Sequence, residues 1–282
     1  MSELPFTFSP GNLIAPGVYW LNVNLHPVFA AISAAVEASL NFLEAILMAL
    51  PAGGVIVIVA VLARMLSNWR MAVLAACSLG FCWLMGLWAA SMQTIALMVL
   101  AVTLSVVIAF PLGVMASRRK TVWSLLRPLL DMMQAVPPWV YLIPVVIIFG
   151  LGRTPALIAT VIYGLPPMLR LTTLGLNHVP KPLLELGAAL GATRSTILWK
   201  IELPAAKPTI LVGLNQCIML SLAIVVLAGL VGSGGLGGEV TRGLARMEIG
   251  IGLRAGLSIV AIAVLLDRLS RAALDREPRR TA

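Results

Sequence analysis

Few side chains in this sequence are of the types that commonly carry out chemistry. His26 and His178 are the two histidines, and neither has a Cys, Asp or Glu at a spacing suited to binding a metal. The three cysteines, Cys77, Cys82 and Cys217, lie in apolar stretches and form no CxxC pair. We therefore expect thiols that pack as small apolar groups, no metal site and no Ser-His-Asp arrangement.

A glycine-rich segment at 232–238, GSGGLGG, has the form GxGxxG. A dinucleotide site needs this motif between a strand and a helix of a βαβ unit, whereas here it follows a long apolar run. We interpret the segment as a flexible turn. The sequence has no GxxxxGKS or GxxxxGKT motif, whose backbone would hold ATP phosphates, so ATP-driven work would require a partner subunit.

The composition explains the scarcity of reactive groups. Of the 282 residues, 60% are hydrophobic and 11% are charged, and the mean hydropathy is +1.00. An ordinary soluble domain has about 25% charged residues, so a conventional soluble enzyme is excluded. Because an apolar helix of about 20 residues spans a bilayer, we expect an all-α polytopic membrane protein.

Long apolar runs between charged residues predict about seven membrane spans. The apolar run 28–47, which comes before the first predicted span, carries Glu37 and Glu44 seven residues apart on one face. This pattern favours an interfacial or packing helix. The predicted spans are 48–66, 71–90, 93–117, 132–150, 155–176, 208–231 and 249–268. The expected organisation is a tail with the interfacial helix (1–47), two accessory spans (48–90), a five-helix core (91–270) and a basic tail (271–282).

Basic residues are unevenly distributed among the connections between these spans. Sixteen of the 20 Lys and Arg residues fall in alternate loops and the C-terminal tail. Because positively charged loops face the cytoplasm, the N-terminus is predicted outside and the C-terminus inside. The net charge of +9 then reflects topology, and no nucleic-acid partner is expected. The outer segments hold the remaining four, Arg153, Arg242, Arg246 and Arg254.

The longest inner loop, 179–208, is too long and too polar to be a simple connector. An Ala-rich helical run is broken by Gly191, after which Thr193 or Ser195 can cap a second short helix that ends at Pro204. Such a hairpin suits either a groove on another protein or the lipid surface. The side chains expected at its surface are Leu184, Glu185, Arg194, Leu198, Lys200, Ile201 and Glu202.

The spacing within this loop resembles the EAA loop of permease subunits of binding-protein-dependent ABC importers. Gly191 follows Glu185 by six residues, and a further Ile, Leu and Pro follow at sixteen, eighteen and nineteen. The departure from the family pattern is that Leu186 and Gly187 replace the two alanines after the glutamate. In that family the loop is the coupling helix that docks on the ATPase, so the resemblance implies an ABC importer type I permease fold. The residues to which it assigns ATPase coupling are Glu185, Gly191, Arg194, Lys200, Ile201, Leu203 and Pro204.

Four further stretches, 127–152, 163–176, 213–237 and 255–268, look like signatures of the glycine betaine/choline/proline-betaine branch. The resemblance implies a homodimer of permeases in the bacterial cytoplasmic (inner) membrane, two ATP-binding cassette subunits and an external substrate-binding protein. It also implies that ATP and Mg bind the partner ATPase and that this chain binds no cofactor. The implied substrates are quaternary-ammonium compounds.

A path for such a cation must be bounded by polar, aromatic or proline-broken segments. The alternative is that the same amides and prolines pack helices together, while the aromatic rings anchor the chain at the membrane interface. The candidates for lining the path are Met133, Gln134, Pro137, Trp139, Tyr141, Asn215, Gln216 and Met219, beside Met132, Pro138, Tyr163, Pro166 and Pro167. The amides Gln134, Asn215 and Gln216 are the strongest of them, because amides in hydrocarbon seek partners. Ion pairs are expected between Arg127 and Asp131 and between Asp267 and Arg268.

Other classes of function remain open from the residues alone. A secondary transporter or channel for a small polar solute also uses broken helices, but it would place carboxylates in mid-span, and none is found there. An ABC permease for a different small solute would share the inner loop. A membrane-embedded enzyme would need a polar catalytic cluster, which the sequence does not provide.

Overall fold

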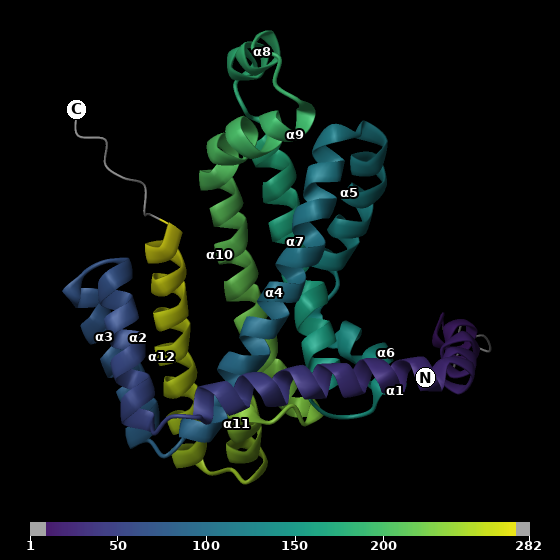
Figure 1. Ribbon diagram of the computed structural model, residues 1–282. Coiled ribbons are helices and arrows are strands. Elements are labelled where there is room, and N and C mark those ends of the chain that lie inside the picture. Colours follow the sequence, from purple (N-terminus) through teal and green to yellow (C-terminus); the bar gives the residue numbers. More distant parts are fainter. Residues whose placement is uncertain (1–9, 275–282) are drawn as a thin grey trace, which may run out of the picture.

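The structure, a computed structural model, describes residues 10–274 and consists over that range of helices and connecting turns (Figure 1). The all-α prediction is confirmed. The helices are α1 Pro10–Met48, α2 Ala52–Leu66, α3 Trp69–Leu84, α4 Trp88–Arg118, α5 Lys120–Ala135, α6 Pro138–Phe149, α7 Arg153–Asn177, α8 Lys181–Ala189, α9 Arg194–Ile197, α10 Leu203–Ala228, α11 Gly235–Ala245 and α12 Ile249–Leu274. A π-helical turn, Leu198–Glu202, joins α9 to α10, and a 3-10 turn, Gly229–Val231, follows α10.

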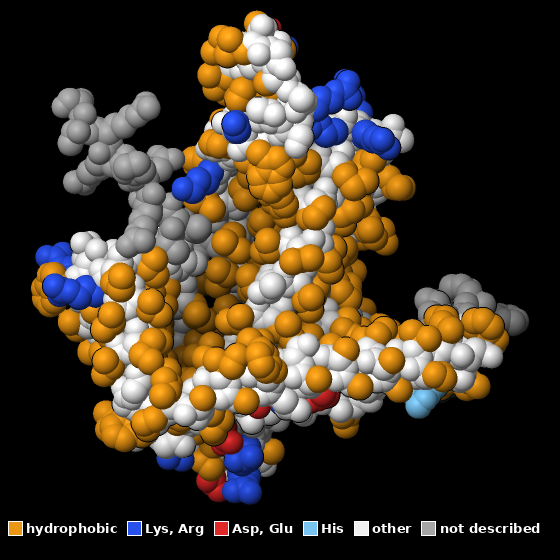
Figure 2. Space-filling view, viewed as in Figure 1, with side chains coloured by type: hydrophobic (Ala, Val, Ile, Leu, Met, Phe, Trp, Pro, Cys, Tyr) orange, Lys and Arg blue, Asp and Glu red, His pale blue; other side chains and the backbone are white. Residues whose placement is uncertain are grey.

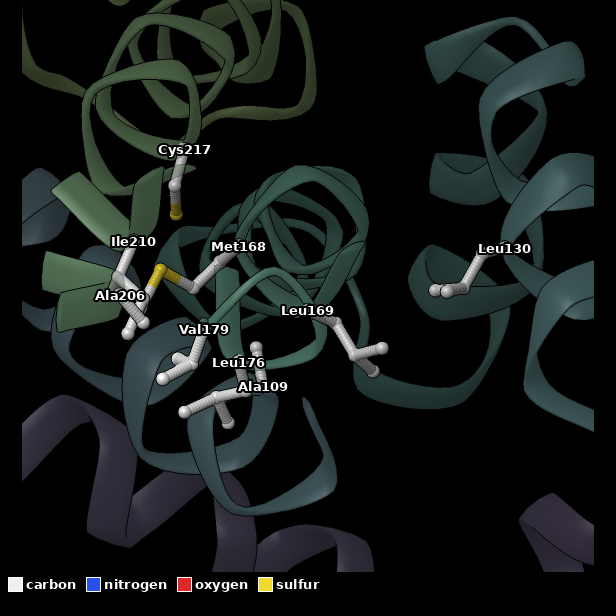
Figure 3. Packing of buried hydrophobic residues seen from close by; sticks show 9 residues of the cluster. All are labelled: Ala109, Leu130, Met168, Leu169, Leu176, Val179, Ala206, Ile210 and Cys217. Atoms are coloured by element: carbon white, nitrogen blue, oxygen red, sulfur yellow. The ribbon is translucent and has the colours of Figure 1, made fainter. Parts of the chain in front are cut away.

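Helices α4, α7 and α10 pack together as the centre of the molecule. Small residues bring them close: a Cβ added at Gly113 of α4 would lie 2.7 Å from Cβ of Thr172, and one at Gly213 of α10 would lie 2.9 Å from Cβ of Leu171. Small residues allow such close approach of helices in membranes, where packing rather than water expulsion drives association. Figure 3 shows the buried cluster that results, in which Met168 and Cys217 lie together.

A second apolar cluster joins α2 and α3 to α12. Its buried members include Ala63, Ala75, Leu79 and Leu265, and Met92 of α4 completes it. In Figure 1 the α2–α3 hairpin stands beside α12, away from α5 and α6. These two helices therefore attach to the rest of the bundle mainly through α12.

Five helices of the described range are long and apolar enough to cross a membrane, or six spans if the bent pair α5–α6 counts as one. Of the seven predicted spans, four correspond to α4, α7, α10 and α12, each among those five. Helices α2 and α3 have 15 and 16 residues, so at the α-helical rise they are about 22–24 Å long. They fall short of the apolar thickness of about 30 Å that a full span must cover.

The fifth long apolar helix is α1, which lies crosswise at one end of the bundle (Figure 1). Its polar face meets the start of α7. Arg153 donates hydrogen bonds to Glu44 (2.8 Å), to Asn41 (2.8 Å) and to Glu37, so the two glutamates seven residues apart hold one arginine. The opposite side of α1 leaves apolar side chains such as Trp20 and Phe42 exposed.

The predicted fourth span, 132–150, is not one straight helix. Helix α5 ends at Ala135, α6 begins at Pro138, and the two axes differ by 98°. Proline cannot donate a backbone hydrogen bond and disfavours helical geometry in the preceding residue. Val136 is accordingly extended, and Pro137 and Pro138 begin the new direction.

The glycine-rich segment 232–238 is a closely packed turn followed by a helix, so the expectation of a flexible turn is wrong. Gly232, Gly234 and Gly235 have positive φ angles of 81°, 72° and 62°, which glycine adopts without steric cost. A Cβ added at Gly229 would lie 2.1 Å from the carbonyl carbon of Gly237. The 3-10 turn that follows α10 therefore lies directly against the first turn of α11.

Candidate coupling surface and inner cavity

Helix α8 projects from one end of the molecule, opposite the end where α1 and α11 lie (Figure 1). Pro182 lies in its first turn, where a missing backbone N–H costs nothing. Gly191 has a φ of +73° and ends the helix by reversing the chain. Thr193 caps the next helix, because its hydroxyl accepts a hydrogen bond from the backbone N–H of Thr196 at 3.2 Å. The predicted hairpin of two short helices is therefore present.

The apolar side chains that this hairpin exposes differ from the predicted ones. Leu184 and Leu198 pack against the central core and Ile201 is half-buried, so the expectation that these three are exposed is wrong. Leu184 and Leu198 belong to the cluster that contains Leu176 of α7 and Ala206 of α10. The exposed apolar side chains are Leu183, Leu186, Leu190 and Trp199, with Leu190 78% exposed. Glu185, Arg194 and Lys200 are exposed beside them.

Gly187, which replaces an alanine of the EAA pattern, has a steric explanation. Gly187 is buried, and a Cβ there would lie 2.6 Å from Cδ1 of Ile201 and 3.4 Å from Cγ1 of Ile197. Alanine at this position would require Ile201 to change its rotamer. Gly187 and Ile201 thus form the contact that holds α8 against the chain leading into α10.

The second short helix does not end at Pro204, contrary to the prediction. The chain continues through the π-helical turn Leu198–Glu202 into α10, whose first turn contains Leu203 and Pro204. Proline is tolerated there because the first N–H groups of a helix lack partners within that helix. The hairpin of α8 and α9 is therefore continuous with α10.

Glu202, the last residue of the π-helical turn, is buried and ionically paired. Nη1 of Arg118 at the end of α4 donates to Oε1 of Glu202 at 2.9 Å, and Nη2 donates to Oε2. The Glu202 side chain is 5% exposed, whereas that of Arg118 is 45% exposed. This bidentate pair ties the root of the coupling hairpin to α4, and spacing could not have revealed it because 84 residues separate the partners.

A polar cavity of about 570 Å³ lies beside α7, between α5 and α10. Gln134 and Gln216, two of the predicted path residues, line it together from different helices. Arg170 of α7 also lines it and pairs with Asp131 of α5. The full lining is Trp123, Arg127, Gln134, Pro167, Arg170, Leu171, Thr173, Leu174, Asn177, His178 and Gln216.

Both predicted ion pairs are replaced by others. Asp131 pairs with Arg170 across the α5–α7 contact instead of with Arg127 in its own helix, and Arg127 instead lines the cavity. Asp267 pairs with Arg271, one helical turn later, instead of with the adjacent Arg268. Adjacent residues point in different directions on a helix, whereas residues four apart lie on one face.

The other predicted path residues are dispersed. Asn215 accepts a hydrogen bond from the Ser270 hydroxyl at 3.2 Å and so joins α10 to α12. Tyr141 donates to the carbonyl of Met133 at 2.6 Å, which braces the α5–α6 bend formed at Pro137. Trp139 and Met219 are 47% and 46% exposed, and neither lines the cavity. Of the remaining candidates, Met132 is exposed, Pro138 begins α6, Tyr163 packs against the cluster around Leu142, and Pro166 is buried in α7. Pro167 is also buried in α7 and, unlike the others, lines the cavity.

Charge and apolar surface are separated along the molecule. In Figure 2, Lys and Arg side chains lie near the end that carries α8, beside α2 and α3, and, together with Asp and Glu, at the end opposite α8, whereas apolar side chains cover the middle. Within the described residues, His, Cys, Asp and Glu side chains form no group of three that could hold a metal ion. Two surfaces therefore stand out: the exposed hairpin and the polar cavity below it.

Comparison with known proteins identifies the family. A family model described as "Binding-protein-dependent transport system inner membrane component" matches residues 109–277. The glycine betaine/proline betaine transport system permease protein ProW of Escherichia coli strain K12 is 39% identical over 259 residues, covering 92% of this chain and 73% of the relative. The glycine betaine transport system permease protein OpuAB of Bacillus subtilis strain 168 is 37% identical over 254 residues, covering 90% of each.

The fold has a counterpart among solved structures. A chain of the MetNI methionine ABC transporter, in an inward-facing conformation, superposes with a TM-score of 0.57 over 67% of this chain and 93% of that one, at 22% identity. This likeness supports the type I importer permease fold, and the apolar helices agree with a multi-pass protein of the inner membrane. The chain belongs to the inner-membrane components of binding-protein-dependent transport systems.

Proposed function

We propose that this chain is the permease subunit of an ATP-driven importer for quaternary-ammonium osmoprotectants of the betaine type. Two copies form the translocation path, two separate ATPase subunits bind ATP and Mg, and an external binding protein delivers the substrate. This chain carries no ATPase site and binds no cofactor. Relatives named as glycine betaine and proline betaine permeases support the substrate class.

The exposed coupling hairpin is the observation that carries the proposal. Leu186 and Leu190 project from α8 with 59% and 78% of their surfaces exposed, and Glu185 and Arg194 lie beside them. An apolar ridge rimmed by charges is typical of a helix that docks in a groove. The groove belongs to the ATPase in this proposal, and Leu186 in place of the family alanine is matched to it.

Transport follows from the mechanical connection of the hairpin to the bundle. Closure of the ATPase dimer displaces α8, and the close Gly187–Ile201 contact passes the displacement to the start of α10. The Arg118–Glu202 pair carries α4 along with it. Re-tilting these helices opens the path alternately to each side of the membrane. Gln134 and Gln216 face that path at the inner cavity, α1 lies at the outer membrane surface, and the basic tail faces the cytoplasm.

The decisive experiment changes α8 and measures both assembly and uptake. Glu185→Lys and Gly191→Trp should abolish uptake of radiolabelled glycine betaine in cells that lack other betaine importers, and should release the ATPase in a pull-down. Gly191 is sensitive because its φ of +73° suits no bulky residue. The matched controls are Glu248→Lys and Gly250→Trp at the other end of the bundle, which should leave both measurements unchanged. Normal uptake by the α8 variants would refute the coupling assignment.

A further inference from the structure

The inner cavity combines groups that suit a small zwitterion. Its volume of about 570 Å³ lies in the range of small-molecule sites, about 300–1,000 Å³. Trp123 and Arg127 are four residues apart on α5, so they share one face of that helix, and both line the cavity. Arg170 faces them from α7, and amides of Gln134 and Gln216 complete a polar wall. An aromatic ring and two guanidinium groups thus line the same cavity.

The positive charge of the cavity lining favours a ligand with an anionic group. As the structure describes it, the lining contains no Asp or Glu. Asp131 neutralises Arg170 through one ion pair, whereas Arg127 makes no ion pair with a described residue. Nε of Arg170 is buried without a hydrogen-bond partner, so Asp131 does not use all the donors of that guanidinium. The lining therefore offers an anion the exposed guanidinium of Arg127, which has no described ion-pair partner, and a spare donor of Arg170.

We propose that this cavity is a substrate subsite that holds a betaine by both of its charges, an inference that rests on the proposed function. The carboxylate accepts hydrogen bonds from Arg127 and Arg170, for which planar guanidinium groups are well suited. The trimethylammonium group lies against the Trp123 ring, which attracts cations through its π-face. The permease thereby selects quaternary amines that carry a carboxylate. A simple cation such as choline meets the positive charge of Arg127 without any compensating bond.

The test measures binding to the permease–ATPase complex in nanodiscs of zwitterionic lipid, with the external binding protein left out. Equilibrium dialysis with radiolabelled glycine betaine should show saturable binding at millimolar concentrations, and radiolabelled choline should bind at least tenfold more weakly. Arg127→Gln should weaken glycine betaine binding by about tenfold, because hydrogen bonds to charged groups are stronger than neutral ones. Arg119→Gln removes the same charge between α4 and α5, outside the cavity lining, and should have no effect.

Four results would overturn the subsite. Three of them are equal binding of choline and glycine betaine, unchanged glycine betaine affinity in Arg127→Gln, and no glycine betaine binding at millimolar concentrations. Displacement of glycine betaine by phosphatidylglycerol in the nanodisc would also overturn it, because the cavity would then be a lipid headgroup site. A measurement of glycine betaine uptake by the whole transporter distinguishes failure of the subsite proposal from failure of the proposed function. A transporter that imports glycine betaine while its permease fails these tests has the proposed function without the subsite, and one that imports no quaternary amine lacks the function itself.

Discussion

The Arg118–Glu202 pair predicts an asymmetric response to the loss of either partner. Arg118→Met leaves the Glu202 carboxylate, 5% exposed, without its counter-charge. Glu202→Gln leaves the Arg118 guanidinium, which is 45% exposed and can be hydrated, and the new amide still accepts one hydrogen bond. The two variants therefore test burial and charge separately.

The magnitudes follow from the exposure of each partner. Removing one partner of a buried ion pair costs about 3–5 kcal/mol, and the partial exposure of Arg118 places Arg118→Met near the lower end, at about 3 kcal/mol. Removing the counter-charge of an exposed charged group lowers the free energy of unfolding by about 1 kcal/mol or less. This is the value expected for Glu202→Gln. Thermal unfolding of both variants in the same detergent should show a decrease in Tm at least twice as large for Arg118→Met.

The double variant Arg118→Met/Glu202→Met supplies the control. Because it removes both charges and fills the site with apolar atoms, it should recover part of the stability that Arg118→Met loses. It should still import substrate less efficiently per ATP hydrolysed, because α4 is no longer tied to the hairpin. Equal Tm losses in the two single variants, or a double variant less stable than both, would refute the burial argument.

Three further outcomes follow from contacts in the fold. Arg153→Gln should release α1 from α7, so limited proteolysis should cut within α1 faster than in the parent, and unchanged cleavage would contradict the three hydrogen bonds. Gly229→Ala should prevent accumulation of folded protein, because the added Cβ would lie 2.1 Å from the carbonyl carbon of Gly237. The protein with Gly238→Ala should accumulate normally, because a Cβ at that position has no neighbour within 4 Å. Asn215→Leu should lower Tm, because it removes the hydrogen bond from Ser270, and should change uptake by the folded protein little. Gln216→Leu should lower uptake and change Tm little, because Gln216 lines the cavity.

The sequence predicts the long central helices well because their ends are chemically marked. The span predicted at 155–176 is α7, Arg153–Asn177, since the apolar run is bounded by Arg153 and by a polar connection. The turn at Gly191 and the cap at Thr193 are predicted equally well, because both depend only on neighbouring residues. The predicted end of the second helix at Pro204 is wrong, because the chain continues into α10. The break between α5 and α6 had a visible signal in Pro137 and Pro138, but continuous hydropathy concealed it.

Contacts between elements that lie far apart in the sequence could not be predicted from it. Asp131 has Arg127 one turn away, and only the packing of α5 on α7 makes Arg170 the partner. Glu37 and Glu44 marked a polar face of α1, yet nothing local connected that face with Arg153, more than a hundred residues later. The amides Asn215 and Gln216 are adjacent in sequence and differ in position because a helix turns their side chains apart.

The π-helical turn has a geometrical consequence for energy transfer. A π turn contains one residue more than an α turn, and one residue rotates an α-helix by about 100°. The angle between the exposed face of the hairpin and the cavity-facing side of α10 is therefore set by a single additional residue within Leu198–Glu202. Deleting one residue there would rotate the exposed face of the hairpin by about 100° relative to α10.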